Sequence, residues 1–390
     1  MNFSHRTDWH RRQNRVAELL DKLRTEGRPI IDLTESNPTK CGFCYPADQI
    51  RQALSQPAVL EYNPDPRGLL SARASVSAYY LKDGIAVDPS EIFLTAGTSE
   101  SYSHLFKLLC NPGDNLLVPQ PSYPLFDYLA ELNDVKLQTY RLQYDHEWQI
   151  DIDSLRRAIT STTKALVIVS PHNPTGMILK QEEYEEIRHI ARRHRLAIIS
   201  DEVFGEYAFN KNAELVTSAA SEDEILTFVL NGISKLAGLP QVKLGWIIVR
   251  GTDAHEAEDR LEILCDTFLS VGTPIQIALS SIMTFADGIR TDILKRVKNN
   301  YAFACSAASG STSLLESAGG WYAVLRVPRT TTDEEWVLSL LEERGISLFP
   351  GYFFDFEEEG FLVVSLLPEE PDFRRGFTEA AKFINDSVRR

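Results

Sequence analysis

Short apolar runs recur along the middle of the chain, and each is followed by turn residues and then by a helical pattern. The runs cover residues 92–94, 116–118, 165–169, 197–199, 228–230 and 246–249. Consecutive apolar residues put apolar side chains on both faces of a strand, so such strands need cover on both sides. Between the runs, apolar positions recur at helical spacing, for example over 181–194. The pattern predicts an α/β fold with a mostly parallel sheet covered by helices.

The two ends of the chain follow a different pattern. Helical spacing dominates over residues 10–26 and 273–305, and residues 30–33 have the pattern of a short strand. Beyond 305, strands are predicted over 321–327, 346–349 and 361–366, with helices over 333–344 and from 372 onward. These segments indicate a smaller α+β unit. No low-complexity linker precedes it, so we expect the boundary to fall within a helix, near residues 285–305.

Length and charge exclude several classes of protein. The chain has 390 residues, 43% of them hydrophobic and 24% charged, which is typical of a globular protein of two or three domains. The formal net charge of −15 argues against nucleic acid as the main partner. No apolar stretch is long enough to span a membrane, and residues 1–15 lack the apolar core of a secretory signal. We therefore expect a cytoplasmic protein without a membrane partner.

Five cysteines include one pair, Cys41 and Cys44, in a C-x-x-C arrangement. A structural zinc site needs a second pair of ligands at compatible spacing, and none is apparent. Without an export signal, a disulfide framework is also not expected. We interpret the pair as ordinary thiols and predict no metal site.

Polar residues follow several of the predicted strands at the point where each strand ends. They are Gly97, Thr98 and Ser99 at the start of a helix, Asn173 in an Asn-Pro-Thr-Gly turn, Asp201, the pair Ser234 and Lys235, and Lys243. In open α/β sheets, ligands bind outside the carboxyl ends of the strands. His172, beside the Asn-Pro-Thr-Gly turn, could also approach this edge. We expect these groups to converge on one site.

This set of groups suits pyridoxal phosphate. The aldehyde of that cofactor needs a lysine amine, here Lys235. Its ring nitrogen needs a carboxylate, here Asp201, to stay protonated. Its phosphate needs amides, hydroxyls and a cation, which the 97–99 turn, Ser234 and Lys243 supply. Each group alone has an ordinary structural explanation, such as a turn or a helix cap, and their joint occurrence favours the cofactor.

From about Asp32 to Ser365 the chain resembles the fold type I, class I/II aminotransferase family. The resemblance implies that Lys235 binds the cofactor covalently and that Asn173 contacts the 3-oxygen of its ring. It also implies that Tyr123 stacks on the ring. The segment Tyr-Asn-Pro at Tyr62 resembles the one whose tyrosine reaches the phosphate of a neighbouring subunit.

The family resemblance also implies an architecture and an activity. We expect a large domain over residues 46–290 with a mostly parallel seven-stranded sheet, and a small domain built from residues 1–45 and 291–390. The expected assembly is a homodimer with a shared active site. The expected reaction moves an amino group between an amine or amino acid and an oxo acid by a ping-pong Schiff-base mechanism. Alternatives are a lyase or decarboxylase with the same fold and cofactor, or a non-catalytic module that binds pyridoxal phosphate.

Three positions depart from the family pattern. Lys243 stands where the family usually has arginine, so the charge is kept and the bidentate fork is lost. Phe204 stands where a tyrosine usually bonds the 3-oxygen of the ring. Val363 stands where an arginine usually binds the α-carboxylate of the substrate.

The valine at 363 leaves three interpretations open. The alignment could be displaced, although no arginine lies between Arg344 and Arg374. Another cation could replace the missing one, for which Lys40 and Arg67 are candidates. Alternatively, the substrate could lack an α-carboxylate, since a buried carboxylate without a cation or donors is disfavoured. The loop that contains Lys40 also makes Ser36 a candidate substrate-binding residue.

Overall fold

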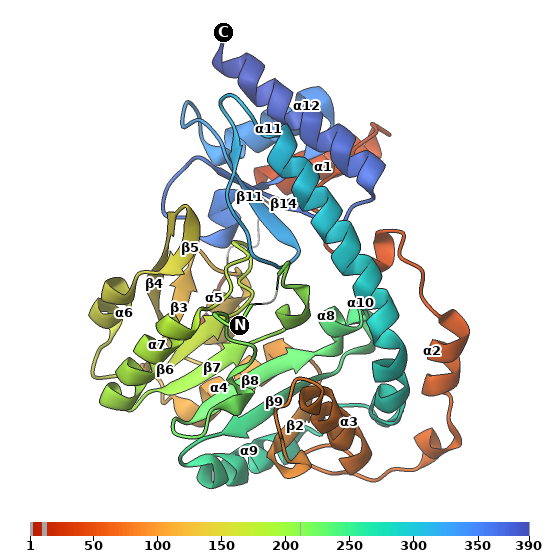
Figure 1. The fold of residues 1–390 in the computed structure, drawn as a ribbon, viewed down its shortest axis with the longest axis vertical. Coiled ribbons are helices and arrows are strands. Elements are labelled where there is room, and N and C mark those ends of the chain that lie inside the picture. Colours follow the sequence, from red (N-terminus) through yellow and green to blue (C-terminus); the bar gives the residue numbers. More distant parts are fainter. Residues whose placement is uncertain (1–2, 10–13, 211, 390) are drawn as a thin grey trace.

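A computed structural model describes residues 3–9, 14–210 and 212–389 of the chain (Figure 1). Its largest element is a sheet of eight strands in the order β2-β9-β8-β7-β6-β3-β4-β5. Their bounds are β2 Ile92–Thr95, β3 Asn115–Gln120, β4 Lys136–Asp145, β5 Glu147–Ile150, β6 Thr163–Val169, β7 Ala197–Asp201, β8 Thr227–Gly232 and β9 Gly245–Arg250. The five strands from β8 to β4 in this order run parallel, and β9 is antiparallel to both β8 and β2. The predicted mostly parallel sheet is confirmed, and β5 adds an eighth strand to the expected seven through an antiparallel pairing with β4.

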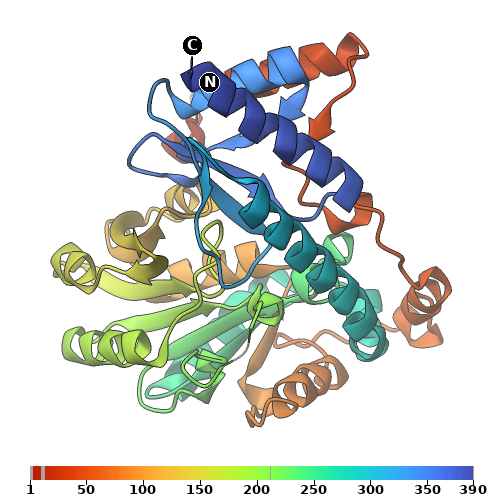
Figure 2. The same cartoon turned by 45° about the horizontal axis from the view of Figure 1, so that its top comes forward.

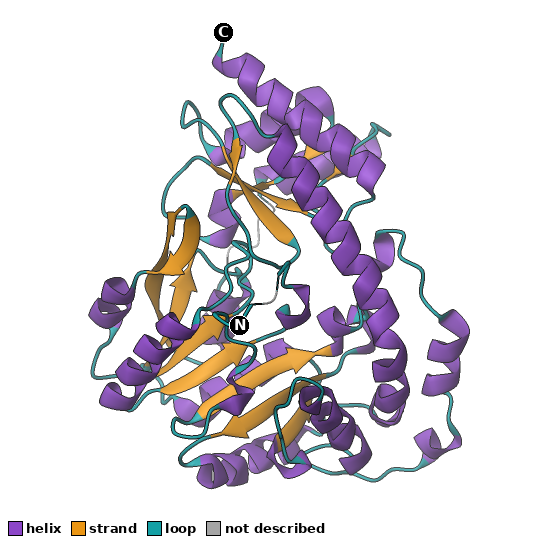
Figure 3. Ribbon diagram, in the orientation of Figure 1, coloured by secondary structure: helices purple, strands orange, loops and turns teal. Residues whose placement is uncertain are grey.

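The sheet is covered by helices on both faces because successive side chains along each strand point into two different apolar cores. Phe93 and Ile199 belong to the core under α4 (Thr98–Leu109), α5 (Leu125–Leu132) and α9 (Ala254–Phe268). Their strand neighbours Leu94 and Ile198 belong to the other core, which includes the apolar face of α7 (Gln181–His194). Successive strand residues point to opposite faces, so one apolar run serves both cores. Figure 3 shows helices lying on both sides of the strands.

The second part of the fold is a small sheet built from late strands. Its order is β10-β11-β14-β13, with β10 at Ser313–Leu314, β11 at Tyr322–Arg326, β13 at Phe349–Pro350 and β14 at Phe361–Ser365. A separate pair joins β1 (Ile31–Asp32) to β12 (Ile346–Ser347) in parallel. The amide of Ser365 donates to the carbonyl of Leu33 at 2.8 Å, which ties the early segment to this sheet. Segments from both ends of the chain are therefore in contact in this part of the fold.

The remaining helices cover the small sheet or join it to the large one. They are α1 (Arg15–Thr25), α2 (Ala47–Leu54), α3 (Leu70–Leu81), α6 (Ile152–Ala158), α8 (Ile233–Leu236), α10 (Thr273–Ala307), α11 (Asp333–Arg344) and α12 (Glu370–Val388). Helix α10 has 35 residues and runs from the large sheet to the small one (Figures 1 and 2). The domain limit proposed at residue 290 thus lies inside a helix. Residues 10–13 of the predicted first helix lie outside the described residues.

Short 3-10 helices complete the fold. They are η1 His5–Thr7, η2 Pro38–Lys40, η3 Pro57–Leu60, η4 Pro89–Glu91, η5 Gly205–Tyr207, η6 Ala219–Ser221, η7 Pro240–Val242 and η8 Gly351–Phe354. Over the described ranges, no single helix is long and apolar enough to cross a membrane, and α9 with α10 meets the length and composition criteria only as a pair bent by 119°. In the same part of the chain, no group of three or more His, Cys, Asp or Glu side chains is arranged to hold a metal ion. Cys41 is buried and Cys44 exposed, and both are free thiols.

Candidate active site

A cavity opens at the carboxyl edge of the parallel strands, between the two sheets. Ten of the predicted site residues line it: Ser36, Gly97, Thr98, Ser99, Tyr123, Asn173, Asp201, Ser234, Lys235 and Lys243. Phe204, Tyr102 and Tyr322 also line it. Residues from seven separate segments thus meet at one place, as the rule for ligand sites in α/β sheets predicts.

Asp201 ends strand β7 and is fixed by two hydrogen bonds. The hydroxyl of Tyr102, on α4, donates to its Oδ2 at 2.9 Å, and the amide of Val203 donates to its Oδ1 at 3.1 Å. Burial raises the pKa of Asp201 to about 6, while these two hydrogen bonds and the charge of Lys235 oppose that rise. The carboxylate is therefore held in one orientation, and a nearby cation would favour its ionised form.

Lys235 lies on the short helix α8, directly after β8. Its Nζ lies 4.8 Å from the ring centroid of Trp321 and 5.5 Å from that of Phe204. The hydroxyl of Tyr207 donates to its backbone carbonyl at 2.7 Å. Burial lowers the pKa of Lys235 to about 8, and the charge of Asp201 opposes this shift. A substantial fraction of this amine is therefore unprotonated near pH 8, as a nucleophile requires.

The turn that opens α4 forms a cradle for an anion. Gly97 has φ +138°, and a Cβ added to it would lie 3.4 Å from Nζ of Lys243. A Cβ on Gly245 would lie only 3.0 Å from the Cα of Gly97, so the two backbones are in close contact. The free amides of a helix start and a nearby ammonium group are the donors that a phosphate needs.

Asn173 supplies a second sign of a ligand. Its side chain is buried and its Oδ1 has no hydrogen-bond partner among the described residues. Buried amide oxygens are normally paired, so an unpaired one facing a cavity indicates a group that binds there. With the cradle, Lys235 and Asp201, the residues present fit pyridoxal phosphate.

Several predicted residues lie elsewhere. Lys40 is exposed on η2 and is not part of the described cavity lining, so its predicted role is not supported by this geometry. Arg67 is paired with Glu262 at 2.7 Å and Glu258 at 3.3 Å, which fixes it away from the cavity. Tyr62 lines a different pocket and is 80% exposed, so its role toward a second subunit stays a prediction.

His172 does not reach the cavity either. It is buried, and its Nδ1 lies 2.9 Å from Oγ1 of Thr175. Burial lowers the pKa of His172 to about 3, so this imidazole stays neutral. It stabilises the turn that carries Asn173.

Val363 lies in the middle of β14 with no exposed surface. It pairs with Val324 of β11 and with Phe349 of β13. Strand β14 contains no cationic residue at any position, so a displaced alignment does not restore the missing cation. The first of the three interpretations is therefore excluded.

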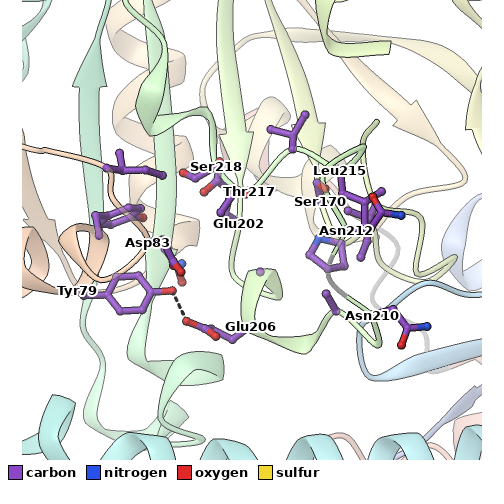
Figure 4. Close-up of a pocket in the computed structure, with 18 residues that line it drawn as sticks. Tyr79, Asp83, Ser170, Glu202, Glu206, Asn210, Asn212, Leu215, Thr217 and Ser218 are labelled. Carbon is purple, nitrogen blue, oxygen red and sulfur yellow. Dashed lines mark hydrogen bonds between the residues drawn. The ribbon is translucent and has the colours of Figure 1, made fainter. Parts of the chain in front are cut away.

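A second cavity lies behind the loop that follows β7 (Figure 4). Glu202, which lines this cavity, follows Asp201, which lines the first. Oε1 of Glu202 accepts hydrogen bonds from Oγ of Ser200 at 2.9 Å and from the amide of Ala219 at 2.8 Å. Figure 4 also shows the hydroxyl of Tyr79 donating to Glu206, at 2.8 Å. These acidic groups are internally paired and hold the loop against the sheet.

Sequence reasoning missed four aromatic residues of the site: Tyr102, Phe126 and Tyr322, which line the cavity, and Trp321, which lies beside Lys235. Tyr102 lies four residues after Thr98, one helical turn along α4, which is the only local signal for it. Tyr322 is the first residue of β11, far along the chain, and Trp321 directly precedes that strand. Only the packing of the small sheet against the large one brings them to Lys235.

Comparison with known proteins agrees with this geometry. The model of the family "Aminotransferase class I and II" matches residues 28–371. The "Glutamate-pyruvate aminotransferase AlaA" of Haemophilus influenzae is 28% identical over 377 residues, covering 94% of this chain and 93% of that protein. The alanine aminotransferase of Pyrococcus furiosus has a TM-score of 0.90 at 25% identity, covering 99% of this chain and 100% of that one. An Escherichia coli aminotransferase has a TM-score of 0.87 at 26% identity, with 98% of each chain covered. The protein described here therefore belongs to the class I and II aminotransferase family.

Proposed function

We propose that the protein is a pyridoxal-phosphate-dependent aminotransferase that moves an amino group between an amine or amino acid and an oxo acid. Bound in the cavity, the cofactor would supply an aldehyde that takes up the amino group and a ring that accepts electron density. The observation that carries the proposal is the joint position of Lys235 and Asp201 in one buried cavity, with each altering the pKa of the other.

Each group of residues in the cavity would have its own role toward the cofactor. Lys235 would hold the cofactor, and its freed Nζ would then move a proton to and from the carbon that bears the amino group. Asp201 would keep the ring nitrogen protonated, helped by the fixed orientation that Tyr102 imposes. The 97–99 turn and Lys243 would bind the phosphate, and Tyr123 and Asn173 would contact the ring and its 3-oxygen. Phe204 can donate no hydrogen bond to that oxygen.

The covalent role of Lys235 can be tested directly. The purified protein, incubated with pyridoxal phosphate, is expected to absorb visible light and to yield one borohydride-reduced adduct, mapped by mass spectrometry to Lys235. Lys235→Ala should lose the adduct, whereas Lys40→Ala, at an exposed lysine outside the described lining, should keep it. An undiminished adduct in the Lys235→Ala protein would exclude this lysine.

Two alternatives share the cofactor, and kinetics separate them. An aminotransferase needs a second, oxo substrate and shows ping-pong kinetics. A lyase would release ammonia from a single amine, and a decarboxylase would release carbon dioxide. A non-catalytic module would bind the cofactor and show no spectral change with any amine.

We also propose a homodimer located in the cytoplasm. The apolar side chains of Leu60, Tyr62 and Leu70 lie exposed on one stretch of chain, at 89%, 80% and 61%, which supports an interface there. Sedimentation of the purified protein checks the dimer: a monomer at micromolar concentration would contradict it.

A further inference from the structure

On the side of the small sheet, the wall of the cavity contains two residues that carry hydroxyl groups, Ser36 and Tyr322. Of the described lining residues, only Ser36 and Tyr322 come from outside the predicted large domain. Burial raises the pKa of Tyr322 to about 12, while a hydrogen bond with Ser36 opposes that rise. Both hydroxyls therefore stay uncharged, and each can donate or accept a hydrogen bond.

The structure behind these hydroxyls is apolar. Paired residues of β11 and β14 share a face, so Tyr322 with Ser365 and Val324 with Val363 lie on the same side of the sheet. Both valines have no exposed surface. The ring centroid of Phe354, which is also buried, lies 6.1 Å from that of Tyr322. A charged group of a ligand would find no opposite charge in this wall.

The charges near the wall are unfavourable for an anion. The lining contains two cations among the described residues, Lys235 at the ring position and Lys243 at the phosphate cradle. Glu35, next to Ser36, is close enough that its charge raises the pKa of Tyr322. A carboxylate placed here would lose its water and meet negative charge, whereas a neutral hydroxyl would meet two hydrogen-bonding partners.

We propose that the carbon bearing the reacting amino group carries a neutral hydrogen-bonding substituent, such as a hydroxymethyl group, bound by Tyr322 and Ser36, and no carboxylate. This inference rests on the aminotransferase function proposed above and narrows its substrate class. An oxo acid meets the same condition if its carboxylate lies away from the oxo carbon. The overall exchange stays balanced: the donor loses its amino group and one hydrogen and gains a carbonyl oxygen from water, while the acceptor gains the amino group and one hydrogen and releases its carbonyl oxygen as water.

Matched substrate pairs test the inference in the holoenzyme. Alaninol and alanine differ only in a hydroxymethyl group against a carboxylate, and hydroxyacetone and pyruvate differ in the same way as acceptors. Single-turnover rate constants, followed by the absorbance of the cofactor, should be at least about tenfold higher for the hydroxylated member of each pair, since each 1.4 kcal/mol of preference is a factor of ten. Equal rates, or faster reaction of alanine and pyruvate, would overturn the inference.

Variants locate the preference at the two hydroxyls. Tyr322→Phe and Ser36→Ala should each weaken the binding of alaninol several-fold and leave that of 2-aminopropane, which lacks the hydroxyl, unchanged. Tyr352→Phe is the control, because its half-exposed hydroxyl bonds Glu334 outside the described lining. Dissociation constants, from titrations that follow the cofactor spectrum or the unfolding temperature, give this comparison without turnover. Unchanged preference in both variants would refute the role of the wall.

The substrate inference and the function can fail separately. A protein that forms no adduct at Lys235 would disprove the function. A protein that forms the adduct and prefers alanine over alaninol would disprove only the substrate class.

Discussion

The hydroxyl of Tyr102 donates a hydrogen bond to Oδ2 of Asp201 at 2.9 Å, across 99 positions of sequence. Both groups are buried, and this bond favours the ionised form of the carboxyl group. Helix α4 thus begins at the proposed phosphate cradle and, one turn later, positions Asp201, the proposed partner of the ring nitrogen.

Tyr102→Phe is expected to weaken cofactor binding about tenfold to a hundredfold, because a hydrogen bond to a charged group contributes about 1.5–3 kcal/mol. Titration of the apoprotein with pyridoxal phosphate measures the change. Tyr140→Phe is the matched control, since its buried hydroxyl donates to the carbonyl of Val167, away from the described lining of the cavity. Equal losses in both variants would mean that Tyr102 acts only through the stability of the fold.

The rate at which the apoprotein takes up pyridoxal phosphate should rise with pH through a midpoint of about 8. Only the unprotonated amine of Lys235 reacts, and burial lowers its pKa from 10.5. Asp201→Asn should move the midpoint to lower pH, because the charge of Asp201 raises the pKa of Lys235. Stopped-flow absorbance between pH 6 and 11 measures both. A midpoint near 10.5 would show that Lys235 is not desolvated.

Lys243→Ala should reduce the affinity for pyridoxal phosphate far more than the affinity for pyridoxal, which lacks the phosphate. A Cβ built on Gly97 would lie 3.4 Å from Nζ of Lys243, so we expect the charge of Lys243 to act on the phosphate rather than on the ring. Lys243→Arg should keep the preference for the phosphorylated form. The ratio of the two dissociation constants is the measurement, and an unchanged ratio in Lys243→Ala would place the phosphate elsewhere.

Gly97→Ala should destabilise the protein by about 1–3 kcal/mol, because its backbone lies in a region that side chains rarely adopt. It should also weaken cofactor binding, since the new methyl group would occupy space in the cradle, in van der Waals contact with Nζ of Lys243. Gly84→Ala is the control, with φ +78° and nothing within 4 Å of the added Cβ. Urea unfolding and cofactor titration together separate the two effects. If Gly84→Ala also lost affinity for the cofactor, the loss of affinity in Gly97→Ala would be a consequence of backbone strain and not of the methyl group in the cradle.

Sequence patterns were sufficient to predict the bounds of an element where that element is regular and buried along one defined face. Helices α7 and α11 begin and end at the predicted residues, 181–194 and 333–344. Each has a capping interaction at its start and is followed by a residue in the left-handed conformation, Arg195 or Gly345. Strands β4 and β5 were not predicted. In β4 most residues are exposed or half-buried and only Tyr140 and Leu142 are fully covered, so no apolar run marks it.

The site was predictable where chemistry follows directly from a strand end, as for Asp201 and Lys235. It was not predictable where distant segments meet. Trp321 lies against Lys235 because the chain directly before β11 packs at the cavity. This contact joins distant segments and cannot be predicted from a local sequence pattern. Lys40 was assigned to the substrate from its loop alone, and the direction of its side chain depends on how η2 packs.

The two ends of the protein meet at the cavity: Oγ of Ser365 donates to the carbonyl of Glu35 at 2.7 Å, across 330 positions. During synthesis, the segment around Ser36 is translated long before Ser365, to which it is tied through Leu33 and Glu35. The side of the cavity that contains Ser36 and Tyr322 can therefore be completed only after β14 has been translated. Products truncated before β14 would lack these contacts.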